Sequence, residues 1–412
     1  MNTEHADRTL PADGRLEVID ALRGFALLGV SWANLLIFAG ISYMADEQKA
    51  AVFASPLDWP AYRFELFFIE NKFMGLFSFL FGISFWLFLS RTRARATAPL
   101  GLYYRRIFWL FVIGAAHGWL LWCFDILRFY ALWAVLLPLF VRTPPRLLLT
   151  LAVSAAAVVP ACIAGAMTWL SAPAGVETDF DALALATFSA GAYRDVLAVN
   201  WRYDWDMTMS VSQVAYQVAV FGRLLLGLYV ARTLDLGTLA VHRALLRRML
   251  VAGVVAGVIG SSVFTFDLLA GASSTFAWPF VRRLVLEAGQ LGMTLAYACG
   301  LALLFLARRW HPVIRLLAPV GRMALTWFLF QTMFGVWLFY GFTGGPALMG
   351  QVAPSRLVLI CLVGFFAQAA LARVWLRRFR YGPAEWLWRS LTYWKIQPLR
   401  SHVNVHRRNL SD

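Results

Sequence analysis

The chain has 412 residues, of which 60% are hydrophobic and 14% charged, and its mean hydropathy is +0.65. Soluble domains are about 45–50% apolar and about 25% charged, so the composition excludes a soluble enzyme, a disordered chain and a disulfide scaffold. The apolar residues occur in runs of about 20, which is enough to cross about 30 Å of hydrocarbon. Porin-type barrels are excluded because their strands alternate apolar and polar residues. The sequence therefore predicts one all-α, polytopic membrane domain.

Ten apolar runs are predicted to span the membrane, at residues 24–44, 73–90, 107–124, 126–141, 147–170, 209–231, 249–270, 284–307, 323–341 and 356–376. The net charge of +15 is concentrated in short arginine clusters between these runs. The clusters are Arg91, Arg93, Arg95, Arg105 and Arg106; Arg243, Arg247 and Arg248; Arg308, Arg309, Arg315 and Arg322; and Arg373, Arg377, Arg378 and Arg380. This pattern is typical of cytoplasmic membrane loops and does not indicate nucleic-acid binding. A C-terminal tail that binds anionic lipid or nucleic acid is the alternative.

Placing the loop from Arg93 to Arg106 in the cytoplasm fixes the other loops by alternation, and both termini then lie in the cytoplasm. The segment 171–208 falls outside, where its acidic residues outnumber its basic ones. Only Arg282 and Arg283 break the charge rule, either because they face inward as ligands or because a boundary is misplaced.

Residues 1–412 are expected to form a single transmembrane helical domain, because neither a repeat nor a low-complexity linker divides the chain. It comprises a helical core at 19–380 with an external loop at 171–208, followed by a cytoplasmic C-terminal segment at 381–412. The four cysteines form no Cys-x-x-Cys pair, and motifs for nucleotides, metals and serine hydrolysis are absent. We therefore expect neither a metal site nor a tightly bound cofactor.

His117 is the only histidine within a predicted span, and Asp125 lies eight residues later at an outer turn. Ionisable residues inside spans are costly, so each is a functional candidate. Imidazole exchanges protons near neutral pH, and a carboxylate can fix its tautomer. The two residues are therefore the candidate catalytic base and its orienting partner. Contact requires the turn to fold Asp125 back, and the alternative is a buried histidine bonded to a neighbouring helix.

Asp20 and Arg23 are spaced i, i+3 at the inner end of the first span, so they can pair on one helical face. The functional hypothesis is that Arg23 meets the phosphates of a coenzyme, and the alternative is an interfacial cap with a snorkelling arginine. Asn34 lies deeper in the span, where an amide needs a partner.

Five further polar residues in or beside spans are candidates for substrate or donor binding: Lys72, Arg223, Glu287, Gln290 and Gln331. Interhelical hydrogen bonding is the alternative for the glutamines, and snorkelling is the alternative for Lys72. Arg223 and Glu287 each require a partner or water, because a lone charge in lipid is costly.

Five segments resemble the YeiB-type family of bacterial inner-membrane proteins, and they run in order along nearly the whole chain. They are Asp-Ala-Leu-Arg-Gly-Phe-Ala-Leu-Leu-Gly-Val at 20–30, Lys-Phe-Met-Gly-Leu-Phe-Ser-Phe-Leu-Phe-Gly at 72–82, His117 with Asp-Ile-Leu-Arg-Phe-Tyr-Ala at 125–131, Gly-Arg-Met-Ala-Leu-Thr at 321–326 with Gln331, and Gly-Pro-Ala-Glu-Trp-Leu-Trp-Arg-Ser-Leu-Thr-Tyr at 382–393. One departure is Trp327, where the family pattern more often has asparagine.

By its first-span Asp-x-x-Arg-Gly motif, the family is similar to a wider transmembrane acyltransferase superfamily. That superfamily includes bacterial sugar O-acyltransferases and the lysosomal heparan glucosaminide N-acetyltransferase. The resemblance implies a multi-pass inner-membrane protein with about ten helices around a pore. It also implies acyl-coenzyme A as a cytoplasmic co-substrate and a sugar, lipid-linked or other envelope acceptor. The relatives' histidine in or after the first span has no counterpart between His5 and His117, so His117 would substitute from another helix.

Three functional hypotheses follow. In the first, acyl transfer, Arg23 holds coenzyme phosphates, His117 deprotonates an acceptor hydroxyl or amine, and Asp125 orients His117. The second is a transporter of a small polar or lipid-linked molecule that uses the same groups without covalent chemistry. The third is a non-catalytic membrane partner of an envelope enzyme. The absence of an inverted repeat counts against transport, and the missing first-span histidine counts against the enzyme. Lipids are expected partners, and homo-oligomerisation stays open.

Overall fold

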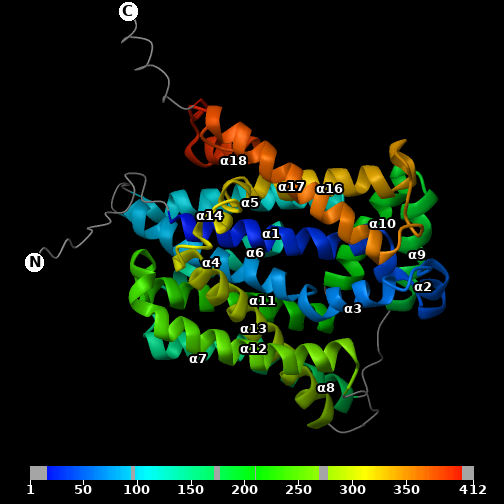
Figure 1. The fold of residues 1–412 in the computed structure, drawn as a ribbon, viewed down its shortest axis with the longest axis horizontal. Helices are drawn as coiled ribbons and strands as arrows, with labels where there is room; N and C mark the ends of the chain where they lie inside the picture. Colours follow the sequence, from blue (N-terminus) through cyan, green and yellow to red (C-terminus); the bar gives the residue numbers. More distant parts are fainter. Residues whose placement is uncertain (1–15, 94–97, 171–176, 209, 269–276, 401–412) are drawn as a thin grey trace, which may run out of the picture.

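The computed structural model describes residues 16–93, 98–170, 177–208, 210–268 and 277–400, and most of its helices run along one long axis (Figure 1). The longer helices are α1 (Glu17–Phe38), α4 (Lys72–Arg93), α5 (Pro99–Leu120), α11 (Val211–Thr233), α12 (Arg243–Thr265), α13 (Ala277–Leu306), α16 (Ala324–Phe339) and α17 (Pro354–Arg378). The shorter helices are α2 (Asp46–Val52), α3 (Asp58–Phe68), α6 (Leu127–Ala134), α7 (Pro145–Val153), α8 (Val159–Trp169), α9 (Glu177–Ala190), α10 (Tyr193–Thr208), α14 (His311–Ile314), α15 (Ala318–Arg322) and α18 (Pro383–Tyr393).

The described residues contain seven helices that are long and apolar enough to cross a membrane, or eight if the bent pair His311–Arg322 and Ala324–Phe339 is one span. This supports the predicted all-α membrane class. Two of the ten predicted runs, 107–124 and 126–141, fall on helices outside that set. The second of these runs contains only the eight-residue α6 and a 3₁₀ turn (Leu137–Phe140), and eight helical residues extend only about 12 Å.

Most of the expected external loop 171–208 is helical, because α9 and α10 occupy it from residue 177 onward. Residues 171–176 of this loop, residues 401–412 of the C-terminal segment, and Arg95 lie outside the described residues. Helices α2, α3, α9 and α10 lie together at one end of the bundle, on the right in Figure 1.

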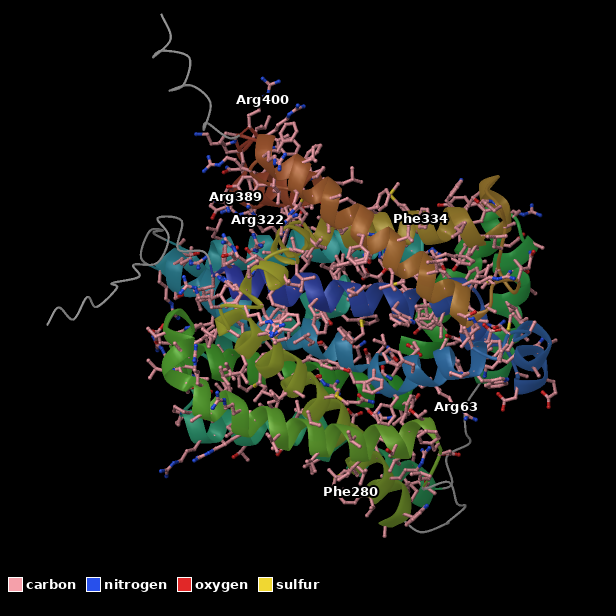
Figure 2. All side chains as sticks on the ribbon, in the orientation of Figure 1. Arg63, Phe280, Arg322, Phe334, Arg389 and Arg400 are labelled. Carbon is pink, nitrogen blue, oxygen red and sulfur yellow. The ribbon has the colours of Figure 1, made fainter. Side chains whose placement is uncertain are left out.

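The other end of the bundle carries many of the arginines, and we refer to it as the arginine-rich end. Helix α1 begins there, and α14 and α18 lie beside it (Figure 1). Figure 2 shows Arg322, Arg389 and Arg400 at this end and Arg63 near the other end. The charge pattern between the apolar runs predicts such an uneven distribution of arginine between the two ends.

Close packing between α1 and α15 brings two of the resembling segments together. If Gly24 were alanine, its Cβ atom would overlap the carbonyl oxygen of Leu317, and if Gly321 were alanine, its Cβ atom would overlap the carbonyl oxygen of Asp20. Small residues allow such close backbone approach between membrane helices. Segment 20–30 therefore lies directly against segment 321–326.

Candidate functional site

A cavity of about 1070 Å³ lies at the arginine-rich end between α1, α4, α5, α16 and α18. It extends along α4 from Arg91 to Phe77, which is about 21 Å at 1.5 Å per residue. Charged side chains line the part near the end of the bundle: Arg23, Arg91, Arg106, Arg322, Arg380, Arg389, Asp20 and Glu385. Apolar and aromatic side chains line the deep part: Phe77, Leu80, Phe81, Leu110, Leu127, Tyr130 and Phe328. The cavity is therefore polar at its mouth and apolar at its floor.

The predicted pair on α1 forms at this mouth. Arg23 donates to the Asp20 carboxylate at 3.0 Å and to the Ser84 hydroxyl on α4 at 2.5 Å. Asp20 is buried, and the Arg23 side chain is 27% exposed, so its guanidinium is held in place beside the cavity rather than extended to the membrane surface. Both residues line the cavity, as the donor-binding hypothesis requires.

Helix α18 forms one wall of the mouth. The guanidinium of Arg106 lies 3.6 Å from the ring centroid of Trp388, and the Trp388 indole N–H donates to the Arg106 carbonyl at 2.8 Å. Arg389 lies over the rings of Tyr381 and Tyr393 at 5.1 Å from each. The Arg106–Trp388 contacts fix the C-terminal segment to α5, so α18 is part of the site.

Glu385 on α18 caps the N-terminus of α16. Its Oε1 accepts the backbone N–H groups of Leu325 at 2.7 Å and Thr326 at 3.1 Å, and its Oε2 accepts the Thr326 hydroxyl at 2.5 Å. Burial raises the pKa of Glu385 above its usual range, while these hydrogen bonds oppose the shift. A carboxylate at a helix N-terminus is favoured by unpaired N–H groups and the helix dipole. The cap joins segment 382–393 to segment 321–326.

His117 and Asp125 are in direct contact, as the catalytic hypothesis requires. The His117 Nδ1 lies 2.8 Å from Asp125 Oδ1, and their side chains are 1% and 0% exposed. Asp125 Oδ2 accepts the backbone N–H of Arg128 at 2.8 Å. Arg128 in turn pairs with Asp204 on α10, so the carboxylate is held within a buried network.

Two glycines on α5 allow the chain to fold back after this helix ends. A Cβ on Gly114 would overlap the backbone nitrogen of Arg128 and lie 2.9 Å from Asp125 Oδ2. A Cβ on Gly118 would lie 3.0 Å from the Arg128 guanidinium carbon. Because Gly114 and Gly118 share one face of α5, that face can accept the turn and bring Asp125 to His117.

His117 lies behind the floor of the cavity and is not among its lining residues. Its ring is 5.3 Å from that of Phe328, which lines the floor, and the residue is 3% exposed. Its Nε2 is buried, with no hydrogen-bond partner in the described structure. Buried polar atoms are usually satisfied, so an unpaired ring nitrogen next to a cavity floor is a candidate for chemistry.

Arg223, Glu287 and Gln290 form a separate cluster away from the cavity lining. Arg223 donates to Glu287 at 2.8 Å and to Gln290 at 3.0 Å, and Arg283 pairs with Glu287 at 2.6 Å. The side chains of Arg223 and Glu287 are 1% exposed. The cluster explains one of the two arginines that broke the charge rule, and it joins α11 to α13.

The other predicted ligands also lie outside the cavity lining. Gln331 donates to Gln368 on α17 at 2.9 Å, which is the interhelical bond that was the alternative for this residue. Lys72 donates to the carbonyl of Leu66 and lies 5.1 Å from the ring centroid of Phe264, and Asn34 is buried on α1. Among the residues described, no group of three or more His, Cys, Asp and Glu side chains is placed to hold a metal ion.

Arg106, Ser84, Phe328 and Glu385 were not selected from the sequence as site residues, although the structure places them at the cavity. Arg106 was present in an arginine cluster, and Glu385 in the resembling segment 382–393. Neither position showed which residue it would face. Only the contact between distant segments gives them a place in the site.

Residues 230–395 match the family described as "Protein of unknown function (DUF418)". The chain is similar to "Uncharacterized protein YxaH" of Bacillus subtilis (29% identical over 410 residues, 95% of this chain and 97% of the relative). It is also similar to "Uncharacterized protein YeiB" of Escherichia coli (27% identical over 393 residues, 91% of this chain and 95% of the relative). A third relative is a 39.9 kDa protein of Bacillus acidopullulyticus, 28% identical over 396 residues, 94% of this chain and 96% of the relative. No solved structure matches. The comparisons support the resemblance to YeiB-type proteins.

Proposed function

We propose that this protein is a membrane-embedded acyltransferase that takes an acyl group from acyl-coenzyme A and passes it to an acceptor hydroxyl or amine. The observation that carries the proposal is one cavity with an arginine-lined mouth and an apolar floor, beside a buried His117–Asp125 pair. In this proposal the arginine-rich end and both termini face the cytoplasm of a bacterium, and the chain lies in its inner membrane. The acceptor is a sugar, a lipid-linked molecule or another envelope component.

The mouth and the floor match the two ends of an acyl-coenzyme A. Guanidinium groups bind phosphates through paired hydrogen bonds, and Arg23 and Arg106 present such groups at fixed positions. An acyl chain would lie against Phe77, Phe81 and Leu110. The volume of about 1070 Å³ lies just above the usual range of about 300–1,000 Å³ for small-molecule sites, which suits a large donor.

The proposed reaction uses Nε2 of His117 as the base. It accepts the proton of the acceptor O–H or N–H while that oxygen or nitrogen bonds to the acyl carbon. The carbon–sulfur bond of the thioester then breaks, and the coenzyme thiolate leaves and takes the proton back from the imidazolium. Asp125 keeps the other ring proton on Nδ1 and stabilises the imidazolium.

Phe328 separates the cavity from His117, since its side chain lines the floor and packs against the imidazole. Access of the thioester to Nε2 therefore requires this ring to turn aside. A ring that covers Nε2 between turnovers would also keep the base from activating water, which protects the thioester from hydrolysis.

Inverted membrane vesicles that contain the protein test the proposal. We expect radiolabelled acetyl- or long-chain acyl-coenzyme A to release coenzyme A thiol and to label a membrane lipid or carbohydrate. His117→Ala should abolish both signals while the protein stays inserted, and His242→Ala, a substitution outside the cavity, serves as the matched control. Unchanged labelling by His117→Ala would remove this residue from the mechanism.

One observation favours transport as a second candidate. The helices His311–Arg322 and Ala324–Phe339 meet at a bend of 75°, and broken helices next to a binding site are common in transporters. Proteoliposome assays separate the two functions. Passage of a coenzyme A derivative or a lipid-linked sugar across the membrane without covalent change would favour transport.

A further inference from the structure

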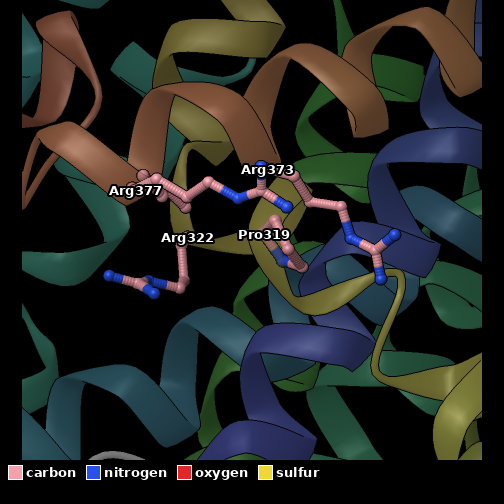
Figure 3. A pocket seen from close by; sticks show the side chains of 5 residues that line it. Pro319, Arg322, Arg373 and Arg377 are labelled. Atoms are coloured by element: carbon pink, nitrogen blue, oxygen red, sulfur yellow. The ribbon is translucent and has the colours of Figure 1, made fainter.

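A second, smaller hollow lies on the outside of the bundle at the arginine-rich end. It has a volume of about 480 Å³ and is lined by Pro319 and Arg322 of α15 and by Arg373, Leu376 and Arg377 of α17 (Figure 3). We call it the α15–α17 groove. In Figure 3 the Arg377 side chain runs across the groove above Pro319 toward Arg373, while Arg322 extends in the opposite direction.

Two of the arginines of this groove lie on α17, a candidate membrane span. Arg373 and Arg377 are exposed and spaced i, i+4, so they share one face of α17 and lie about 6 Å apart along its axis. Within the described ranges, neither is paired with a carboxylate. Arg373 and Arg377 therefore present positive charge to the groove that no carboxylate of the described residues neutralises.

The floor and the flanks of the groove are apolar. Pro319 of α15 and Leu376 of α17 line it. Leu371 and Val374, also on α17, are 57% and 55% exposed. Exposed aliphatic residues on a candidate membrane span face lipid chains, and α17 is such a span that ends at Arg378. The two arginines lie in its last two turns, at the level where lipid headgroups meet the hydrocarbon.

We propose that the α15–α17 groove binds a phosphate group, and that its source is an anionic phospholipid of the surrounding leaflet. The guanidinium groups of Arg373 and Arg377 donate to the phosphate oxygens, and the glycerol and upper acyl carbons lie over Pro319 and Leu376. The inference does not depend on acyl transfer, because the groove lies outside the cavity that holds the proposed chemistry.

The position of the groove gives this lipid a consequence for the cavity. Arg322 and Leu376 line both hollows, so they form the wall between them. A lipid bound through its phosphate to α17 and through its glycerol and acyl carbons to Pro319 of α15 would hold the two helices together and thereby support one side of the cavity mouth. Anionic lipid would then act as a structural ligand of the site.

The test measures retention of phosphatidylglycerol and of phosphatidylcholine by native mass spectrometry, after release of the protein from vesicles that contain both lipids. We expect wild-type protein to retain phosphatidylglycerol preferentially. The variant Arg373→Gln/Arg377→Gln should bind it about 30-fold more weakly, since each of the two arginines near an anionic lipid contributes about 1 kcal/mol. Because both side chains are exposed, we expect the variant to fold.

The matched control is Arg247→Gln/Arg248→Gln on α12, which removes two exposed arginines from another predicted cytoplasmic cluster. The proposal is overturned if the groove variant retains phosphatidylglycerol like wild type, or if the control variant loses it equally. Should the double variant fail to fold, the single variants Arg373→Gln and Arg377→Gln replace it, and each should bind phosphatidylglycerol about fivefold more weakly than wild type. Undiminished binding by both single variants would overturn the proposal equally.

A separate arm identifies the source of the phosphate. Inorganic phosphate is added to the wild-type protein in place of lipid and as a competitor of phosphatidylglycerol. If inorganic phosphate does not displace phosphatidylglycerol, the result supports a lipid ligand. If millimolar inorganic phosphate displaces it, the groove is still a phosphate site, but its ligand is soluble and the assignment to a lipid is overturned. Equal retention of phosphatidylcholine and phosphatidylglycerol by wild-type protein would contradict a phosphate site based on charge.

Discussion

Replacing Asp125 by asparagine isolates the orienting role of this residue, because the change keeps its size and removes its charge. The two carboxylate oxygens serve two donors: Oδ1 meets His117 Nδ1 at 2.8 Å, and Oδ2 accepts the backbone N–H of Arg128 at 2.8 Å. An asparagine has one oxygen and one NH₂ group, so it can accept only one of these bonds. The backbone N–H of Arg128 cannot change its role, whereas the imidazole can change its tautomer.

The favoured asparagine orientation therefore places oxygen on Arg128 and NH₂ on His117. The imidazole must then accept at Nδ1 and carry its proton on Nε2, where it cannot act as a base. The opposite orientation sets two donors against each other in a buried site, which costs about 1–3 kcal/mol. That cost reduces the active tautomer about 5- to 150-fold. Loss of the carboxylate charge that stabilises the imidazolium brings the expected decrease in turnover to about 10³–10⁴.

The assay is acyl transfer by inverted vesicles, with rates normalised to inserted protein and unfolding midpoints measured for each variant. Asp46→Asn is the control, because this carboxylate is 86% exposed and lies on α2. The reasoning fails if Asp125→Asn keeps turnover within tenfold of wild type while His117→Ala is inactive. In that case the base would work without its orienting carboxylate.

Three further predictions test other parts of the structure. Glu287→Gln should lower the free energy of unfolding by about 3–5 kcal/mol, because Arg223 is 1% exposed and would lose its only carboxylate in the described cluster. Denaturant titrations measure this change, and a loss under about 1 kcal/mol would contradict the prediction. Phe328→Ala should speed modification of His117 by an imidazole-selective acylating reagent at least about tenfold, because the Phe328 ring covers His117, which is 3% exposed. Peptide mass spectrometry measures the rate of modification, and an unchanged rate would show that Phe328 does not limit access. Because burial raises the pKa of Glu385, this carboxyl group binds a proton more tightly in the folded chain than in the unfolded chain. The free energy of unfolding should therefore fall as pH rises from about 4.3 through the raised pKa, and then level off. Unfolding midpoints across this range should show the fall in wild type and lack it in Glu385→Gln.

Local spacing predicted the parts of the site that lie within one helix. The Asp20–Arg23 pair follows from i, i+3 spacing, and the structure shows it at 3.0 Å. The same rule at i, i+4 would have paired Arg283 with Glu287 and resolved an exception in the charge pattern. The apolar runs predicted the membrane class because spanning hydrocarbon demands about 20 apolar residues in sequence.

Contacts between distant segments were beyond the sequence. Glu385 caps α16 across 59 positions of chain, and no local pattern marks a carboxylate as the partner of a particular helix start. The contact of His117 with Asp125 depended on a turn whose only sequence signal is the Gly114 and Gly118 pair. Helices α9 and α10 were not predicted for another reason. Alternation of the spans and the acidic residues of 171–208 predict the side of the membrane on which this segment lies, and not its backbone conformation.

The two buried charge clusters differ in a way that separates structure from chemistry. In the first cluster Glu287 binds both Arg223 and Arg283, and Gln290 accepts from Arg223; the nitrogen left unpaired is Arg223 Nε, which belongs to a guanidinium and can only donate. In the second cluster both oxygens of Asp125 are used, and the unpaired His117 Nε2 is an imidazole nitrogen that can accept a proton. Burial of an unpaired nitrogen costs free energy that a hydrophobic side chain would avoid. The proposed proton transfer at Nε2 would account for this cost, and a substrate in the cavity would reach this nitrogen once the Phe328 ring turns aside.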